Sequence, residues 1–161
     1  PVFVYGQAKF VEDAVNAGAD GVILPDLPPE EAGKFLGFAN AKSLDTIFLL
    51  APTSTPDRIQ MVGEASKGFI YYVSLTGTTG TKEALAKNLE EKVSAIKNEV
   101  KLPVLVGFGI SGPEQAKEAG QCSDGVIIGS AIVKLIESHS DPVERDKKIT
   151  EFISSIKTAL N

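Results

Sequence analysis

Short apolar runs alternate with longer amphipathic stretches along the whole chain. The runs are rich in β-branched residues and predict strands at 21–24, 46–50, 69–73, 103–106 and 125–128. Within each run nearly every position is apolar, whereas a half-buried strand alternates. Strands buried on both faces have this pattern, as in parallel sheets that helices cover. The pattern therefore predicts about five consecutive βα units.

The boundaries of the predicted helices carry specific turn residues. Gly18 suits the left-handed position that ends a helix over 7–18. Thr55 and Asp141 each precede a proline, and each predicts the cap of a further helix. Ser111, with Glu114 three residues later, predicts a capping box. The last helix is expected to carry an apolar stripe of Val143, Ile149, Phe152, Ile153, Ile156 and Leu160.

Composition narrows the class of protein. The 161 residues are 43% apolar and 23% charged, and no low-complexity linker divides them, so we expect a single domain over 1–161. Sixteen basic residues against 21 acidic ones leave a net charge of -5, which disfavours a nucleic-acid partner. No apolar run approaches the roughly 20 residues of a membrane span, and no signal peptide opens the chain. We expect a cytoplasmic protein.

The single cysteine and the single histidine are weak candidates for chemistry. Cys122 alone excludes an intramolecular disulfide, and with His139 it falls short of a zinc ligand set, so no metal is expected. Cys122 precedes the last strand with no histidine nearby in the sequence. His139 lies in a polar loop beyond a helix. We expect both to be structural or solvated residues.

Two architectures fit five buried parallel strands: a doubly wound open sheet, or part of an eight-stranded (β/α) barrel. A whole barrel takes about 250 residues, so the chain is short for one. Both architectures place their sites at the carboxyl ends of the strands. The segments that follow the strands therefore carry the candidate chemistry.

The first and third strands are followed by polar segments. Asp26 comes directly after the first strand, either as an acid at the mouth of a site or as a loop residue that pairs with a neighbour or caps the next helix. The third strand leads into 74–82, rich in hydroxyl residues and glycine, which suits a closing lid or an anion cradle. Its glycines and Lys82 do not have the spacing of a nucleotide P-loop. The adjacent Tyr71 and Tyr72 must direct one ring to each side of the strand.

Glycine-rich turns follow the last two strands. Gly107 to Gly112 has the form GxGxxG, but a dinucleotide site needs an acid at the end of the next strand. That strand ends in Gly129 and Ser130, while Asp124 lies at its opposite end. We therefore expect the amides near Gly107 and Gly109 to approach a small anion, with the ring of Phe108 in the pocket.

Gly129 and Ser130 open a short helix, whose first N–H groups and dipole favour an anion. Two such turns after consecutive strands match the phosphate site that many (β/α) barrels build after strands seven and eight. The sequence therefore predicts a partial barrel, strands four to eight, with the first three strands preceding Pro1.

Four motifs, in order and spacing, resemble the tryptophan synthase α subunit family: 25–31 (PDLPPEE), 71–80 (YYVSLTGTTG), 107–111 (GFGIS) and 129–134 (GSAIVK). That family folds as a (β/α)₈ barrel and cleaves indole-3-glycerol phosphate to indole and glyceraldehyde 3-phosphate. The resemblance implies that Gly80, Gly107, Gly109, Gly129 and Ser130 hold the substrate phosphate. It implies a pocket lined by Ile23, Pro25, Leu50, Thr79 and Phe108, together with Tyr71.

The resemblance also implies a mobile lid over 76–82, with Asp26 as a supporting acid near its hinge. It implies no cofactor in this chain, because pyridoxal phosphate belongs to the partner β subunit of tryptophan synthase. The rim that includes Pro28 would face that subunit. Within the lid, Leu75 stands where many members carry Arg, and Thr78 stands where Val is common.

The largest departure from the family concerns catalysis. The family's catalytic Glu and Asp belong to the first part of the barrel and have no counterpart here. Cleavage needs a general acid and a general base, and Asp26 cannot supply both. We expect a lyase-family chain that binds substrate without cleaving it alone. Two alternatives remain: a non-catalytic fragment that binds phosphate esters or docks on a partner, and another phosphate-binding barrel enzyme.

Overall fold

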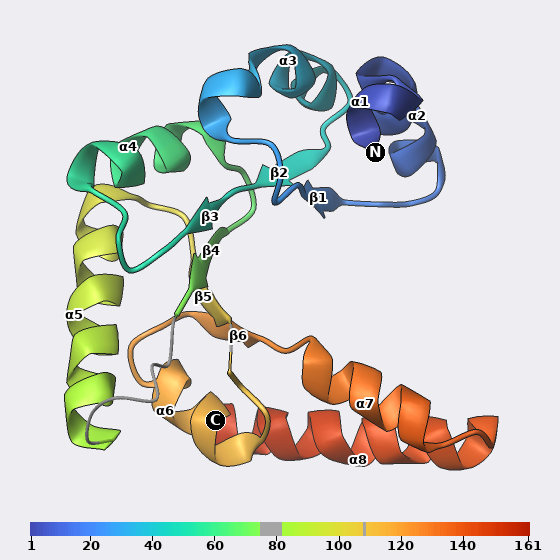
Figure 1. The fold of residues 1–161 in the computed structure, drawn as a ribbon, viewed down its shortest axis with the longest axis vertical. Helices are drawn as coiled ribbons and strands as arrows, with labels where there is room; N and C mark the ends of the chain where they lie inside the picture. Colours follow the sequence, from blue (N-terminus) through green and yellow to red (C-terminus); the bar gives the residue numbers. More distant parts are fainter. Residues whose placement is uncertain (75–81, 108) are drawn as a thin grey trace.

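A computed structural model describes residues 1–74, 82–107 and 109–161. Helices and strands alternate along most of the chain (Figure 1). The strands are β1 (Gly21–Ile23), β2 (Asp45–Ile47), β3 (Leu49–Leu50), β4 (Ile70–Val73), β5 (Val104–Gly107) and β6 (Gly125–Ile127). The helices are α1 (Val2–Tyr5), α2 (Gln7–Asn16), α3 (Gly33–Ala41), α4 (Pro56–Ala65), α5 (Lys82–Glu99), α6 (Pro113–Gly120), α7 (Ser130–Ser138) and α8 (Pro142–Leu160), with a 3₁₀ turn η1 (Pro29–Glu31).

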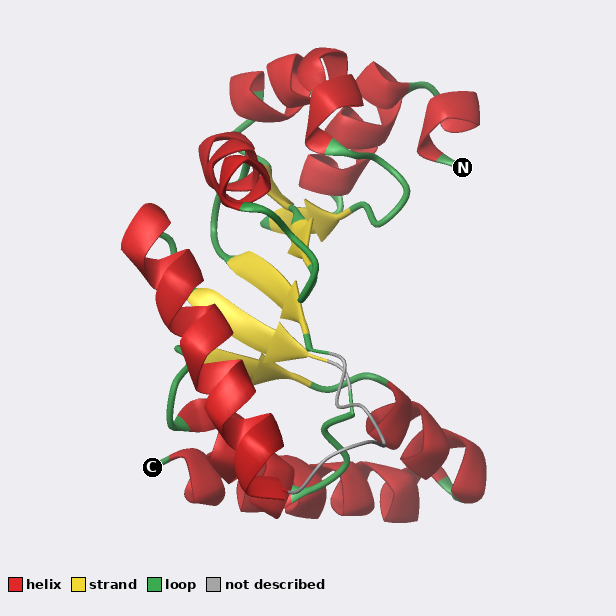
Figure 2. Ribbon diagram, turned by 60° about the vertical axis from the view of Figure 1, so that its left-hand side comes forward, coloured by secondary structure: helices red, strands yellow, loops and turns green. Residues whose placement is uncertain are grey.

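All strand pairs are parallel, and neighbours in space are neighbours in sequence. β1 pairs with β2, and β3, β4, β5 and β6 follow one another in a second sheet. β2 and β3 form the single predicted strand 46–50, interrupted at Phe48. A doubly wound sheet reverses its strand order and carries helices on both faces. Here the order never reverses and the helices lie outside the arc of strands (Figures 1 and 2). The fold is therefore one arc of a (β/α) barrel, as predicted.

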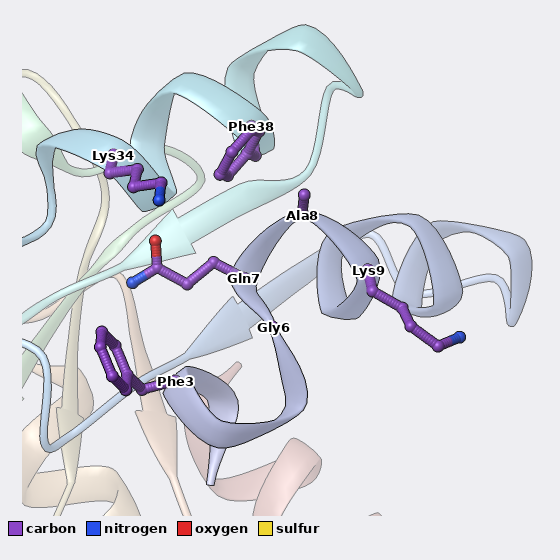
Figure 3. Close-up of a pocket in the computed structure, with 7 residues that line it drawn as sticks. All are labelled: Phe3, Gly6, Gln7, Ala8, Lys9, Lys34 and Phe38. Carbon is purple, nitrogen blue, oxygen red and sulfur yellow. The ribbon is translucent and has the colours of Figure 1, made fainter.

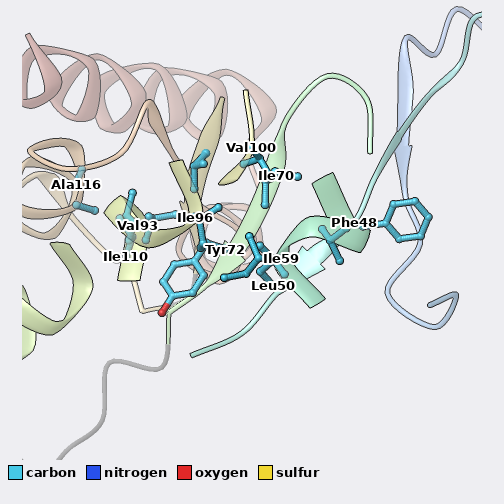
Figure 4. Close-up of a cluster of buried hydrophobic side chains, with 14 of the residues drawn as sticks. Phe48, Leu50, Ile59, Ile70, Tyr72, Val93, Ile96, Val100, Ile110 and Ala116 are labelled. Carbon is cyan, nitrogen blue, oxygen red and sulfur yellow. The ribbon is translucent and has the colours of Figure 1, made fainter. Parts of the chain in front are cut away.

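The main core lies between the strands and the outer helices (Figure 4). Its strand residues alternate along the chain, and all are less than 3% exposed: Phe48, Leu50, Ile70, Tyr72, Val104 and Val106. Ile59, Val93, Ile96 and Ala116 cover them from α4, α5 and α6. The predicted division of the two tyrosines is confirmed, because Tyr72 is buried here while Tyr71 is half-buried on the inner side of the arc.

A second cluster surrounds the first two strands. Val11 of α2, Phe35 and Ala39 of α3, and Leu44 before β2 are each at most 1% exposed. The rings of Phe10 and Phe35 approach with their centroids 6.3 Å apart. α2 and α3 therefore cover the outer side of β1 and β2.

Three predicted helix boundaries are confirmed. Gly18 has φ of 87° and follows α2, and the N–H groups of Gly18 and Ala19 donate to the carbonyls of Val15 and Ala14. This is the Schellman pattern of a helix end. The hydroxyl of Thr55 accepts from the Arg58 N–H at 3.3 Å at the start of α4. Asp141 caps α8 in the same way, 2.8 Å from the Glu144 nitrogen.

The predicted capping box at Ser111 is wrong. α6 begins at Pro113, so Gly112 occupies the cap position, and no side chain caps that helix end. Proline at the first helical position moved the boundary one residue beyond Ser111.

The predicted stripe on α8 is only partly buried. Phe152 and Ile156 pack on the core, but Val143 is 79% exposed and Ile153 is 43% exposed. Near the end of the stripe, Leu160 lies directly over Gly120 of α6. Among the described helices, α8 included, none is long and apolar enough to cross a membrane.

Two helical glycines offer a matched test of packing. A Cβ at Gly63 of α4 would lie 2.3 Å from Val100 Cγ1, whereas a Cβ at Gly37 of α3 would meet nothing within 4 Å. We predict that Gly63→Ala lowers the free energy of unfolding by about 1–3 kcal/mol, because Val100 is short, branched and buried. Gly37→Ala should raise it by up to about 1 kcal/mol through helix propensity. Urea denaturation measures both, and equal effects of the two substitutions would contradict the packing.

Candidate phosphate site at the carboxyl ends of the strands

The parallel register brings the ends of β4, β5 and β6 to one edge. Val73 pairs with Gly107, and Gly107 pairs with Ile127. Adjacent strands lie about 4.8 Å apart, so the segments that leave these three residues begin side by side. The turns that open at Gly107 and Gly129 therefore lie on the same rim, as the sequence predicts.

The end of β5 is held tightly by β4. Gly107 is buried, and the Tyr71 ring lies directly over it, so that a Cβ at this position would be 2.3 Å from Tyr71 Cε2. The Gly107 carbonyl accepts from the Ser74 N–H at 3.0 Å and from the Ser74 hydroxyl at 3.1 Å. Two residues on, Gly109 has φ of 80°, a conformation that favours glycine.

The turn after β6 is open. Gly129 is the N-cap of α7, and a Cβ there would meet none of the described residues within 4 Å. Its carbonyl accepts from the N–H groups of Ile132 and Val133, while the first N–H groups of a helix have no partner within the helix. Ser130, the first residue of α7, is exposed. The turn thus offers amides, a hydroxyl and the positive end of a helix dipole.

The side chains that face the inside of the arc are mostly apolar. Leu49 and Tyr71 face each other across β3 and β4, and Val73, Leu105 and Ile127 continue the surface. Leu50, which was expected to line the pocket, is instead 1% exposed and packs under the helices. Residues alternate sides along a strand, so Leu49 rather than Leu50 reaches the inner side.

Three predicted residues surround the end of β1. Ile23 is 39% exposed, and Pro25 and Asp26 are exposed in the turn that follows. Among the residues that the structure describes, Asp26 forms no hydrogen bond or ion pair, so it neither pairs with a neighbour nor caps α3. Glu30 of η1 instead bonds Arg58 of α4 and joins the segments after β1 and β3.

The remaining predicted residues lie outside the described residues. These are Thr79, Gly80 and Phe108, together with most of the predicted lid and the two departures at Leu75 and Thr78.

The opposite edge of the sheet carries structural polar contacts. Asp124 accepts from the Val104 N–H at 2.8 Å and from the Lys97 ammonium at 2.8 Å. Partial burial raises the pKa of Asp124, but the hydrogen bonds from Lys97 and Val104 outweigh it and hold that pKa below the usual value. Asp124 therefore joins α5, β5 and β6 at the edge away from the candidate site, as predicted.

The two weak candidates have structural environments. Cys122 packs against the main core, and burial raises the pKa of its thiol, which disfavours the reactive thiolate. The His139 ring lies 2.9 Å from the Leu135 carbonyl at the end of α7. Among the described side chains, no group of three or more metal-ligating residues gathers.

A cavity of about 430 Å³ lies between α1, α2 and α3 (Figure 3). Phe3, Gln7, Lys34 and Phe38 line it, and the Gln7 Oε1 atom is buried without a hydrogen-bond partner. Lys9 also borders it but bonds Asp13 at 2.7 Å. Nothing in the sequence predicted this cavity, because its residues come from three separate elements.

Comparisons with known proteins identify the family of this chain. The family model described as tryptophan synthase alpha chain matches residues 1–161. The chain belongs to the tryptophan synthase alpha chain family. The proteins of that name from Geotalea daltonii and Pelobacter propionicus are 48% and 43% identical to it over 160 residues.

Solved structures of the family have the same fold. Tryptophan synthase subunit alpha from Legionella pneumophila superposes with a TM-score of 0.83 at 35% identity, covering 99% of this chain and 59% of that one. A structure of Mycobacterium tuberculosis tryptophan synthase gives 0.84 at 37% identity, with the same coverage. The chain also spans 60% of the length of the Geotalea and Pelobacter relatives. It is thus a partial (β/α) barrel of a family that serves tryptophan biosynthesis.

One contact on this family's rim escaped sequence analysis. Ser74 was expected to be the first residue of a flexible loop, but its hydroxyl bonds the Gly107 carbonyl in a buried position. Only the parallel register of β4 and β5 reveals that these two residues, 33 positions apart, are neighbours.

We predict that Gly107→Ala displaces the Tyr71 ring and lowers the free energy of unfolding by about 1–3 kcal/mol, because the added methyl needs space that the ring fills. Gly112→Ala is the matched control from the same turn, where a Cβ meets no atom closer than Gln115 Oε1 at 3.4 Å. Urea denaturation gives the stabilities, and NMR of the tyrosine ring reports the displacement. An unmoved Tyr71 signal in Gly107→Ala would contradict the contact.

Proposed function

We propose that this chain carries the phosphate and indole subsites of a tryptophan synthase α lyase, which cleaves indole-3-glycerol phosphate to indole and glyceraldehyde 3-phosphate. The observation that supports this most directly is the placement of the Gly107 and Gly129 turns on one rim. Backbone amides and the dipole of α7 there suit a phosphate dianion. The proposed phosphate ligands are Gly107, Gly109, Gly129 and Ser130, with Gly80 from outside the described residues.

The inner side of the arc suits the indole ring. Leu49, Tyr71 and Leu105 form an apolar surface just below the rim. Ile23 and Pro25 border it from β1, and Phe108 and Thr79 are proposed to complete it. A substrate with its phosphate on the rim can thus place its ring against the strands.

We propose that this chain binds the substrate, whereas the groups that cleave it lie elsewhere in the family's barrel. Breaking the bond to indole C3 requires protonation of C3 and removal of a hydroxyl proton. Among the described strand residues, Asp45 is the one carboxylate; it shares the side of Ile23 and Ile47 but stands at the start of β2, away from the rim, and Asp26 lies alone at the end of β1. We infer that the general acid and base come from the part of the family's barrel that this chain does not span. Asp26 and Tyr71 then position the substrate.

A second candidate function, docking on a tryptophan synthase β subunit, is supported by exposed apolar side chains on α1. Phe3 and Val4 of α1 are 85% and 90% exposed. Phe3 borders the same cavity as Lys34, at the start of α3 and just beyond the segment of Pro28. Exposed apolar groups of this size mark interaction surfaces when they cluster.

We predict that the chain binds indole-3-glycerol phosphate, that inorganic phosphate competes, and that no indole is released. Ser130→Ala should weaken binding about tenfold, because a hydrogen bond to a charged group is lost. Ser140→Ala, in the exposed loop between α7 and α8, is the control. The chain contains no tryptophan, so the fluorescence of the ligand's indole group reports binding without a tryptophan background. Equal affinities would contradict the phosphate site, and turnover by this chain alone would contradict the catalytic division.

For docking, we predict that Phe3→Ser weakens the affinity for a tryptophan synthase β subunit about thirtyfold, because burial of a phenyl ring contributes about 2 kcal/mol. Val143→Ser removes a similarly exposed apolar group on α8, 79% exposed, and should leave the affinity unchanged. Sedimentation or calorimetry with the purified β subunit measures both. A complex of unchanged affinity with Phe3→Ser would exclude α1 from the interface.

A further inference from the structure

Ser74 reinforces the last rung of the ladder between β4 and β5. Its N–H donates to the Gly107 carbonyl as the regular ladder bond, at 3.0 Å. Its hydroxyl donates to the same oxygen at 3.1 Å, and the residue is 6% exposed. The carbonyl oxygen has two lone pairs, so both donors can be accommodated.

The other described strand ends have no side-chain hydrogen bond of this kind. Leu24, Ala51 and Ile128 follow β1, β3 and β6 and carry no side-chain donor. Ile128 is the most direct comparison, because it follows the residue that pairs with Gly107 from the other side. The second bond is therefore specific to the strand end from which the candidate phosphate turn departs.

The two bonds constrain the direction in which the chain leaves Gly107. A peptide group is planar, so two hydrogen bonds to its carbonyl oxygen limit the movement of the whole group. The Tyr71 ring packs over the Gly107 Cα and limits rotation on the remaining side. A turn that binds an anion through amides requires these amides to be oriented before the ligand arrives.

We infer that Ser74 is a positioning residue for the substrate phosphate: its hydroxyl orients the turn after Gly107 without touching the ligand. This inference rests on the proposed phosphate site and adds to it a residue from a neighbouring strand. It predicts a selective effect. Affinity for phosphate groups depends on the hydroxyl, whereas affinity for the indole ring does not.

The test uses a pair of variants of equal shape. Ser74→Thr keeps the hydroxyl and Ser74→Val replaces it with a methyl group, so both add the same bulk. Ser74→Ala removes the hydroxyl without added bulk. Ser66→Ala is the control, because Ser66 is also 6% exposed and its hydroxyl has no hydrogen-bond partner. The probes are inorganic phosphate, indole-3-glycerol phosphate and free indole, titrated by calorimetry.

The expected result is a loss of about fivefold in affinity for both phosphate probes in Ser74→Ala and Ser74→Val, which matches one neutral hydrogen bond. Ser74→Thr and Ser66→Ala should retain the wild-type affinity for phosphate. Affinity for indole should be the same in all variants. Hydrogen exchange should accelerate over 107–112 in Ser74→Ala and Ser74→Val, but not near Gly129.

Each contrary result has a distinct meaning. Equal phosphate affinity in Ser74→Thr and Ser74→Val would overturn the inference and leave the proposed function intact. Parallel losses for phosphate and indole would also overturn it, because they indicate general destabilisation. Failure of the wild-type chain to bind either phosphate probe would overturn the proposed function and, with it, the positioning role.

Discussion

The parallel register of β4, β5 and β6 is the constraint on which the rest of this structure depends. Because Val73, Gly107 and Ile127 lie in one row, three segments that are distant in sequence leave the sheet side by side. The anion binding proposed for the rim requires only this alignment of strand ends and the backbone amides that follow them. The outer helices support the same register, since they bury alternate residues of β4 and β5 and thereby fix which side chains face inward.

The fold was predictable because each of its main elements is specified locally. Continuous apolar runs indicated the parallel strands, although β4 is buried on its outer side and only half-buried on its inner side. Gly18, Thr55 and Asp141 marked helix ends by conformational or capping preferences that depend on few neighbours. The error at Ser111 has the same local origin. Ser111 and Pro113 indicate helix starts that differ by one residue, and α6 begins at Pro113, as proline favours the first helical position.

The candidate site was predictable only in part, because its contacts join residues from different strands. Leu50 was assigned to the pocket, yet a strand reverses its sides at every residue, and only the register shows that Leu49 faces inward. Glycines raise a related difficulty. The sequence marks Gly107, Gly109 and Gly129 alike, but Gly107 accommodates the Tyr71 ring, Gly109 adopts positive φ, and Gly129 stands in open space. The same residue type therefore serves three different structural purposes at these positions.

The glycines of the rim are therefore constrained in different ways. Replacing a glycine that makes room for a ring with alanine costs stability even where no ligand is bound, whereas a Cβ at Gly129 would meet none of the described residues within 4 Å. The Gly107 carbonyl is held from within the sheet by Ser74, with the Tyr71 ring over this glycine, whereas the second turn is shaped by the start of α7. In the proposed site, an anion between the two turns would contact a strand end on one side and a helix end on the other. Binding of the phosphate would then depend on the register of β5 and β6, and not on the groups that cleave the substrate.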